Sequence, residues 1–495
     1  MEMPEPNQDV IRRSGELAKA LAAVLPPGAV LDREDQRRAY ESDGLTAYAQ
    51  MPMMVALPET TDQVSKVLAI CGSFGAKVVP RGAGTSLSGG ALPLADGVLL
   101  GMARFNRILD VDYANRCVVA QPGVTNLGIS DAVADRGFYY APDPSSQIAC
   151  TIGGNVAENA GGVHCLKYGL TTNNIQGLEM VLMDGQVMRL GGRHLDQSGY
   201  DLLGVMAGSE GLLAVITEIT VRILPKPQTA QAMLLGFDTV QAAGDCVAAI
   251  IAGGIIPGGM ELMDGPAIRA AEAFAKAGYP TDTQALLIVE VDGTAQEVEV
   301  LAERVSAIAT DHGASTIRAS TSDQERATFW AGRKAAFPAV GRISPDYYCM
   351  DGTIPRGRLA QVLGEIAVMS ERYGLGVANV FHAGDGNLHP LILYDANNPG
   401  ELDRAEQFGA DILRLCVSVG GVLTGEHGVG VEKRDLMDEV FTEDDLAQQQ
   451  RLKCAFDPDG SLNPGKVFPT LHKCAELGRV HVHGGKTRFP GLARL

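Results

Sequence analysis

Two short glycine-bounded segments in the last third of the chain carry residues that can bind a metal ion. The segment HAGDGNLH contains His382 and His389, and GEHGVG contains Glu426 and His427. The Gly-Asp-Gly turn between the two histidines can fold the chain back and bring both imidazoles together. With the carboxylate of Glu426 they form a donor set that suits zinc or another divalent ion. The sequence therefore predicts a metal site at His382, His389 and Glu426.

Further residues in the same part of the chain suit catalysis on a small anionic ligand. His427 follows Glu426 directly, and because adjacent side chains diverge in an extended chain, we do not expect it to share that ion. Arg333, in WAGRKAAFP, is the preferred residue for binding a carboxylate, since a guanidinium offers two parallel donors. Lys334 and Arg342 are alternatives, although a single basic residue is more often a surface charge.

A glycine-rich loop in the first quarter of the chain suits phosphate binding. PRGAGTSLSGG, at residues 80–90, follows a short β-branched strand. Its glycines let backbone N–H groups approach phosphate oxygens without a Cβ in the way. Gly82 and Gly84 are followed by Leu87 where a nicotinamide-type fingerprint has glycine, and the Walker pattern is absent. The loop therefore predicts a phosphate site of another kind rather than a plain turn.

The elements that must position these residues form three units in an α+β fold. Residues 1–225 alternate short apolar strands, Gly/Pro turns and helices at 61–72 and 124–136, and LPKP follows as a linker. Strands are expected at 54–57, 77–79, 98–102, 116–120, 178–183 and 186–190, the last two joined by an Asp-Gly hairpin turn.

The second unit, residues 226–425, has strands at MLLGF, LLIVEV and 315–318 and helices at 240–252, 295–312 and 356–373. This spacing predicts an antiparallel sheet with helices on one face. The last unit, residues 426–495, is expected to be a helical segment that completes the active site and returns to the first unit.

Composition limits the classes of partner. The chain of 495 residues has 46% hydrophobic and 20% charged residues, as a globular protein does, and a formal charge of −18 that disfavours nucleic acid. Nine scattered cysteines without a Cys-x-x-Cys pair predict reduced thiols and no iron–sulfur cluster of its own. Neither a signal peptide nor an 18-residue apolar run is present, so we expect a cytoplasmic protein that meets the membrane only through partners.

Four segments together carry a family resemblance: PRGAGTSLSGG, APDPSS, TIGGNVAENAGG and GSEGLLAVITEITVRILP. In this order they resemble the FAD-linked oxidases of the vanillyl-alcohol oxidase type, whose FAD domain is called PCMH-type. The resemblance implies a PCMH-type FAD-binding domain followed by a substrate (cap) domain. It also implies that FAD is bound by Arg81, Gly82, Ala83, Gly84, Thr85, Ser86, Pro142, Asp143, Ser145, Thr151, Gly153, Gly154, Asn155, Gly162, Glu210, Ile216 and Asn463.

Longer segments narrow the resemblance to the glycolate oxidase group of this family. They are NVAENAGGVHCLKYG, FWAGRKAAFPAVGRISPDYYCMDGTIP, ANVFHAGDGNLHPLILYDA and GEHGVG. The resemblance implies oxidation of glycolate or D-lactate to the 2-oxo acid, with hydride transfer to flavin N5. Related D-lactate and D-2-hydroxyglutarate dehydrogenases use the positions of His382, His389 and Glu426 as metal ligands, and His427 matches the base. The implied partners are a second flavin-type subunit and an iron–sulfur subunit, which accept electrons in place of oxygen.

Two departures refine these expectations. YYCMD, at residues 347–351, lacks the lysine with which D-2-hydroxyglutarate dehydrogenases bind a second carboxylate, so a small monocarboxylic acid is favoured. Thr85 and Ser86 stand where relatives with tethered flavin have a histidine, so FAD is expected to be non-covalent. A stand-alone D-lactate dehydrogenase is the main alternative. A metal hydrolase leaves the flavin segments unexplained, and a non-catalytic flavoprotein leaves His427 and Arg333 unexplained.

Overall fold

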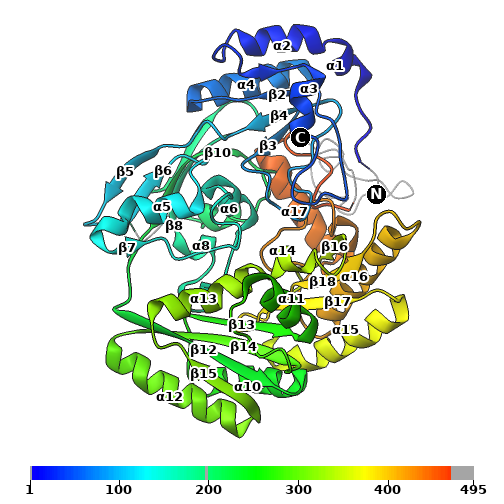
Figure 1. The fold of residues 1–495 in the computed structure, drawn as a ribbon. Helices are drawn as coiled ribbons and strands as arrows, with labels where there is room; N and C mark the ends of the chain where they lie inside the picture. Colours follow the sequence, from blue (N-terminus) through cyan, green and yellow to red (C-terminus); the bar gives the residue numbers. More distant parts are fainter. Residues whose placement is uncertain (1–2, 195–198, 470–495) are drawn as a thin grey trace, which may run out of the picture.

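Two sheets organise the first 225 residues of the chain (Figure 1). The computed structural model describes residues 3–194 and 199–469. One sheet has the order β1-β2-β4-β3, with β4 parallel to both neighbours, and is built from Val30–Leu31, Met54–Ala56, Gly97–Gly101 and Lys77–Arg81. The other is antiparallel with the order β5-β6-β10-β8-β9, built from Ile108–Asp112, Cys117–Ala120, Val215–Arg222, Ile175–Val181 and Val187–Gly191. A two-stranded ribbon pairs β7 (Phe138–Tyr139) with β11 (Leu224–Pro225).

The two helices predicted at 61–72 and 124–136 form as α4 and α5, and further short helices that were not predicted join them. α4 begins after Thr60, whose hydroxyl accepts from the N–H of Gln63, and ends at Gly75 in the left-handed region with φ +67°. Its buried side chains recur at helical spacing and pack against the β1-β2-β4-β3 sheet. The helices are α1 Gln8–Arg12, α2 Ser14–Ala22, α3 Glu34–Arg37, α4 Thr61–Phe74, α5 Asn126–Val133, α6 Ile152–Glu158, α7 Cys165–Tyr168, α8 Thr171–Asn174 and α9 Leu202–Met206.

The next part of the chain forms a seven-stranded antiparallel sheet in the order β15-β12-β14-β13-β17-β18-β16. The strands are β12 Thr229–Phe237, β13 Gly259–Asp264, β14 Ala285–Gly293, β15 Ala314–Ala319, β16 Asp346–Cys349, β17 Val377–His382 and β18 Pro390–Tyr394. This confirms the predicted antiparallel sheet. We call the residues from β12 to α16 (Glu401–Ser418) the cap.

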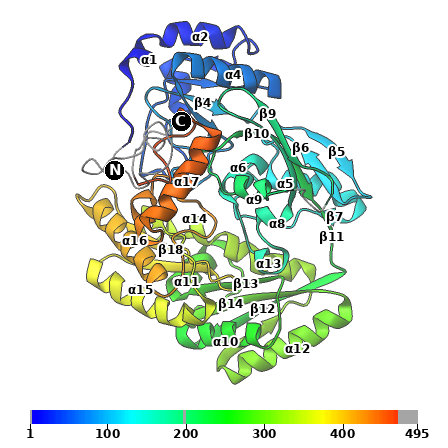
Figure 2. The ribbon, with the colours of Figure 1, turned by 180° about the vertical axis from the view of Figure 1, so that it is seen from behind.

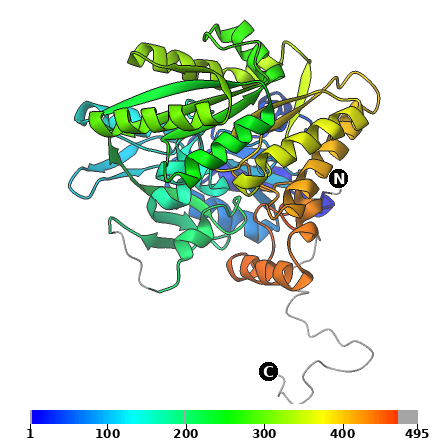
Figure 3. The same cartoon turned by 90° about the horizontal axis from the view of Figure 1, so that it is seen from below.

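Helices cover both faces of the cap sheet, not the single face that the sequence predicts (Figures 1 and 3). Side chains of β12 alternate between two cores, with Leu235 in one and Leu234 in the other. The outer core contains α10 Val240–Ala252, α12 Ala295–Asp311, α15 Leu359–Tyr373 and α16. The inner core contains α11 Gly265–Ala275, α13 Asp323–Lys334 and α14 Ala336–Val340, which lie between the cap sheet and the first half of the chain. The prediction failed because a strand that is apolar on both faces does not indicate which face of the sheet the helices cover.

After the cap, the chain returns to the first half (Figure 2). It runs through η4 (Arg434–Glu439) and α17 (Glu443–Phe456) and then lies along β3, where Asn463 N donates to Val78 O at 2.7 Å. None of the described helices is both long and apolar enough to cross a membrane. Among the described residues, seven cysteines are free and buried, as the predicted reduced thiols require. Cys474 lies outside the described residues.

Candidate active site

A cavity of about 390 Å³ between the first half and the cap brings the two predicted sites together. Its volume is within the range of about 300–1,000 Å³ that is typical of small-molecule sites. All the predicted flavin residues line it except Pro142, Gly162 and Asn463. Arg333, Lys334, His382, His389, Glu426 and His427 line it as well.

The glycine-rich loop is shaped by close backbone contacts. The guanidinium of Arg81 donates to the carbonyl oxygens of Tyr40 at 3.0 Å and Ser42 at 2.5 Å. A Cβ on Gly84 would collide with this guanidinium, and the φ of Gly84 is +72°. A Cβ on Gly82 would collide with the hydroxyl of Thr151, which is buried and has no hydrogen-bond partner among the described residues. Arg81 therefore holds the loop in shape, while the loop backbone and Thr151 face the cavity.

Of the three predicted flavin residues outside the cavity, Pro142 and Asn463 support its wall. The side-chain amide of Asn126 donates to Pro142 O and to Asn155 Oδ1, each at 3.0 Å. Gly162 lines a second, smaller opening instead. The amide of Asn463 donates to Gly90 O at 3.0 Å and Glu210 O at 2.7 Å, and so ties the C-terminal segment to the flavin loops.

The three predicted metal ligands meet. His382 ends β17 and His389 precedes β18, so the hairpin between these strands places the two rings 5.0 Å apart. Oε1 of Glu426 lies 3.0 Å from Nε2 of His382 and 3.5 Å from Nε2 of His389. One ligand atom from each of the three residues lies within 4.8 Å of the others. Neither ring nitrogen of the buried His389 has a hydrogen-bond partner among the described residues, which fits a metal ligand.

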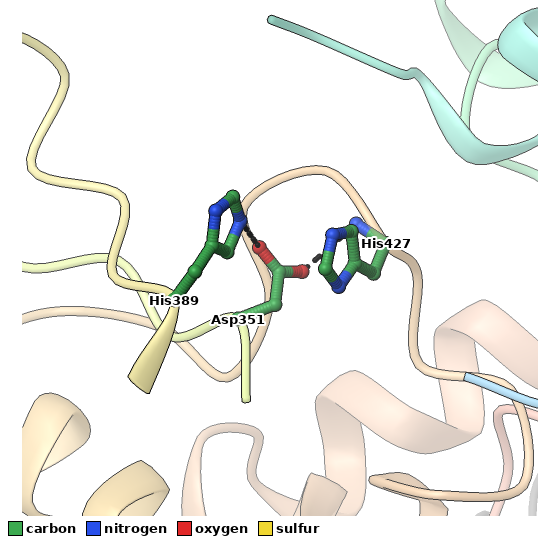
Figure 4. A group of neighbouring side chains, drawn as sticks. All are labelled: Asp351, His389 and His427. Atoms are coloured by element: carbon green, nitrogen blue, oxygen red, sulfur yellow. Dashed lines mark hydrogen bonds and ion pairs between the residues drawn. The ribbon is translucent and has the colours of Figure 1, made fainter. Parts of the chain in front are cut away.

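His427 lies beside this group, and its ring stacks on that of His389 at a centroid distance of 4.9 Å (Figure 4). Burial is the main cause that lowers the pKa of His427 to about 4. The imidazole is therefore neutral at pH 7 and able to accept a proton. His427 is absent from the group that contains Glu426, but with Asp351 and His389 it forms another set of donor atoms within 4.8 Å.

Asp351 organises the GEHGVG loop, a role that the sequence did not reveal. Its carboxylate is fully buried and accepts from the N–H groups of Gly425 and His427, at 3.1 and 2.8 Å. It also accepts from the hydroxyl of Thr424 at 2.6 Å, and Nζ of Lys433 lies 3.3 Å away. On the other side of the loop, Glu210 accepts from the N–H groups of residues 429 and 430, at 2.7 Å each.

Glu261, on β13, is a second residue that sequence reasoning missed. It is fully buried and accepts from Nε of Arg333 at 2.9 Å and from Nδ1 of His382 at 2.7 Å. Arg333 is only 3% exposed, so its guanidinium is fixed in the cavity wall by an ion pair. Lys334 is exposed at the same cavity, whereas Arg342 does not line it and donates to Ala273 O at 3.1 Å.

Comparisons with known proteins identify the family. The FAD binding domain family matches residues 52–191, and the family of FAD linked oxidases, C-terminal domain, matches residues 226–467. Glycolate oxidase subunit GlcD of Escherichia coli K12 is 56% identical over 98% of this chain and 97% of its own length. The chain belongs to the family of FAD-linked oxidases. D-lactate dehydrogenase of Archaeoglobus fulgidus is 33% identical over 92% of this chain and 99% of its own length.

Solved structures show the same fold. 4-Ethylphenol oxidase from Gulosibacter chungangensis superposes with a TM-score of 0.78 at 17% identity, over 94% of this chain and 99% of that one. p-Cresol methylhydroxylase gives 0.77 at 18% identity, over 93% and 97%. At this identity the likeness concerns the fold alone.

The residues of this FAD-linked oxidase suit its cofactor. Gly82 and Gly84 keep the loop free of side chains, and Thr151 offers an unpaired hydroxyl toward the same cavity. These features match the needs of a phosphate that is bound by backbone N–H groups and a hydroxyl. The chain has the FAD binding domain of this family, and the loops that suit a phosphate line the same cavity as the histidines.

Proposed function

We propose that this FAD-linked oxidase oxidises glycolate, and similar small 2-hydroxy acids such as D-lactate, to the 2-oxo acid. The observation that carries the proposal is the single cavity shared by the flavin loops and the histidine–glutamate group. The names of the relatives support the substrate class, since GlcD is a glycolate oxidase subunit and more distant relatives are D-lactate dehydrogenases.

The cofactor and the residues of the cavity have separate roles in the proposed reaction. FAD, when bound, would supply the hydride acceptor. His382, His389 and Glu426 would hold a divalent ion, for which their donor atoms suit zinc, and that ion would supply positive charge to polarise the substrate hydroxyl. Arg333 binds the substrate carboxylate with donors that Glu261 leaves free. His427, neutral at pH 7, takes the hydroxyl proton on a ring nitrogen. The substrate loses this proton and the Cα hydride, which together account for the two electrons removed.

The remaining residues of the proposed FAD site contact the flavin or support the residues that do. We assign flavin contacts to the cavity-lining members of the predicted set, while Pro142 and Asn463 support the wall and Gly162 lines the second opening. The flavin is non-covalent because Thr85 and Ser86 offer only hydroxyls there. Functionally, residues 1–225 bind FAD, residues 226–425 bind substrate, and residues 426–495 complete the active site.

We infer that electrons pass from the reduced flavin to other proteins. The name of the GlcD relative is that of a subunit, and the sequence contains no Cys-x-x-Cys pair for a cluster of its own. We infer a complex with a second flavin-type subunit and an iron–sulfur subunit, in the cytoplasm and in contact with the membrane through those partners. Affinity purification from the native source should recover an iron–sulfur protein, and fast oxygen consumption by the isolated chain would contradict this inference.

Steady-state kinetics with an artificial electron acceptor test the reaction. The panel is glycolate, D-lactate, L-lactate and D-2-hydroxyglutarate, and we expect the highest kcat/KM for glycolate. A much higher value for D-lactate, with full activity of the isolated chain, would favour a stand-alone D-lactate dehydrogenase, which the 33% identical relative makes the second candidate. A yellow protein that oxidises none of the four acids would refute the proposal.

A further inference from the structure

A second cavity lies against the metal-ligand group. It has a volume of about 380 Å³ and shares two wall residues, His382 and Glu426, with the first cavity. Its other walls come from both halves of the chain, since Asn173 belongs to the first half and Arg356 to the cap. The His382–Glu426 pair therefore stands between two cavities, and the flavin loops line only the first.

The second cavity runs from the surface to buried polar groups. Asn173 and Arg356 are exposed, whereas Asn387 is 6% and His382 is 8% exposed. Asn387 Oδ1 and Thr353 Oγ1 have no hydrogen-bond partner among the described residues, although both atoms are buried in residues that line this cavity. Buried polar atoms are normally paired, so this wall is suited to a hydrated path or a polar ligand.

The charges along this cavity suit the passage of a small anion better than its storage. The guanidinium of Arg356 makes no ion pair within 4.0 Å in the described part of the chain. It gives a local positive charge on a protein whose formal charge is −18. Deeper in the cavity, the carboxylates of Asp385 and Glu426 oppose an anion. A carboxylate is thus attracted at the rim and is not held below it.

We propose that this second cavity is the access route by which small carboxylate substrates and products exchange between solvent and the His382–Glu426 pair. The proposal rests on the proposed function. It follows from the position of the cavity, because FAD bound along the flavin loops fills that part of the first cavity. Arg356 is then a residue that captures anions without touching the reacting atoms.

The first test measures how fast oxalate binds to the FAD-loaded protein. Oxalate resembles a 2-oxo acid but cannot donate a hydride, so its binding, followed by the flavin absorbance in a stopped-flow instrument, needs no turnover. We expect Arg356→Glu to slow association by roughly 3–10-fold at low salt and less at high salt, as for steered binding. Arg358→Glu is the matched control, because Arg358 is equally charged and exposed but lies off this cavity.

The second test narrows each opening separately. Asn173→Cys places a thiol at the rim of the second cavity, and Pro338→Cys places one at an exposed position of the first. Each variant is labelled with bulky methanethiosulfonate reagents and compared with its own unlabelled form. We expect the label at position 173 to slow oxalate association several-fold, with an anionic label acting more strongly than a cationic one of equal size.

These outcomes separate the access route from the reaction. Equal association rates for the Arg356→Glu and Arg358→Glu variants would overturn the proposal, as would slowing by the label at position 338 alone. Failure of oxalate to bind the wild-type protein would overturn it as well. If oxalate behaves as expected but no 2-hydroxy acid is oxidised, the proposed function fails and the access route stands.

Discussion

The buried carboxylate of Glu261 should control both the proposed metal site and Arg333, the proposed ligand of the substrate carboxylate. In the wild-type protein it accepts from Nδ1–H of His382 at 2.7 Å, which leaves Nε2 of that ring free to bind a metal. Glu261→Gln can place an amide N–H toward Nδ1, which favours the tautomer with a proton on Nε2. That proton would block the ligand atom. We therefore expect weaker metal binding without loss of FAD.

The magnitudes follow from the surroundings of Glu261. Loss of a carboxylate that supports a metal-bound histidine typically lowers metal affinity by about 10–100-fold. Glu261 and Arg333 are both almost fully buried, at 0% and 4% side-chain exposure. Removing one partner of a buried ion pair costs about 3–5 kcal/mol, and the retained amide oxygen of glutamine places the expected loss of unfolding free energy near the lower end. KM for a 2-hydroxy acid should also rise, because the guanidinium is no longer fixed.

The assay combines elemental analysis after dialysis against a graded chelator, urea unfolding and steady-state kinetics. Asp264→Asn is the matched control, because Asp264 is on the same strand, is 8% exposed and accepts from Asn379 Nδ2 at 2.7 Å. This control should lose stability but keep its metal and its KM. If Glu261→Gln retains wild-type metal content, KM and stability, or if the control loses metal equally, the reasoning is wrong.

Further predictions concern the base, the ligands, the flavin and the contact between the two halves. His427→Ala should lower kcat by about 10²–10⁴-fold but keep both metal and FAD. His382→Ala should lose the metal but keep FAD. Elemental analysis measures the metal, and flavin absorbance measures FAD. Acid precipitation should release all the flavin; yellow colour in the pellet would show a covalent bond. Burial acts to lower the pKa of His164, but Asp143 and Glu290 raise it to about 10. The resulting stabilisation is complete below pH 6.5 and is lost as pH rises through 10. His164→Gln should thus lower the unfolding free energy at pH 7 and not above pH 10; an equal loss at both would contradict the pairing.

Much of the fold follows from local sequence signals. The expected helix at 240–252 is α10, and the predicted Asp-Gly turn joins β8 to β9 with Gly185 at φ +88°. These elements are set by helical periodicity and by a turn that needs a positive φ. The histidine cluster was also accessible, because the turn between His382 and His389 forces the strands into a hairpin.

The supporting carboxylates of Glu261 and Asp351 could not be predicted from the sequence. Glu261 lies in the apolar segment GMELMD and Asp351 in YYCMD, and neither segment has a spacing that indicates a site. Their partners are distant in the chain, 121 residues from Glu261 to His382 and 76 from Asp351 to His427. Only the order of strands in the cap sheet, where β13 lies next to β17, shows that Glu261 faces His382. Such contacts depend on tertiary structure rather than on local pattern.

The GEHGVG loop shows how both halves of the molecule determine the position of His427, the proposed base. Asp351 of the cap holds the loop at His427, and Glu210 of the flavin half holds it two residues further on. Between them Gly428 has φ +82°, and a Cβ there would collide with the carboxylate of Glu158. The loop therefore has no room to shift independently of either half. The position of His427 therefore depends on the docking of the cap against residues 1–225, so the interface between them should affect the proposed chemistry.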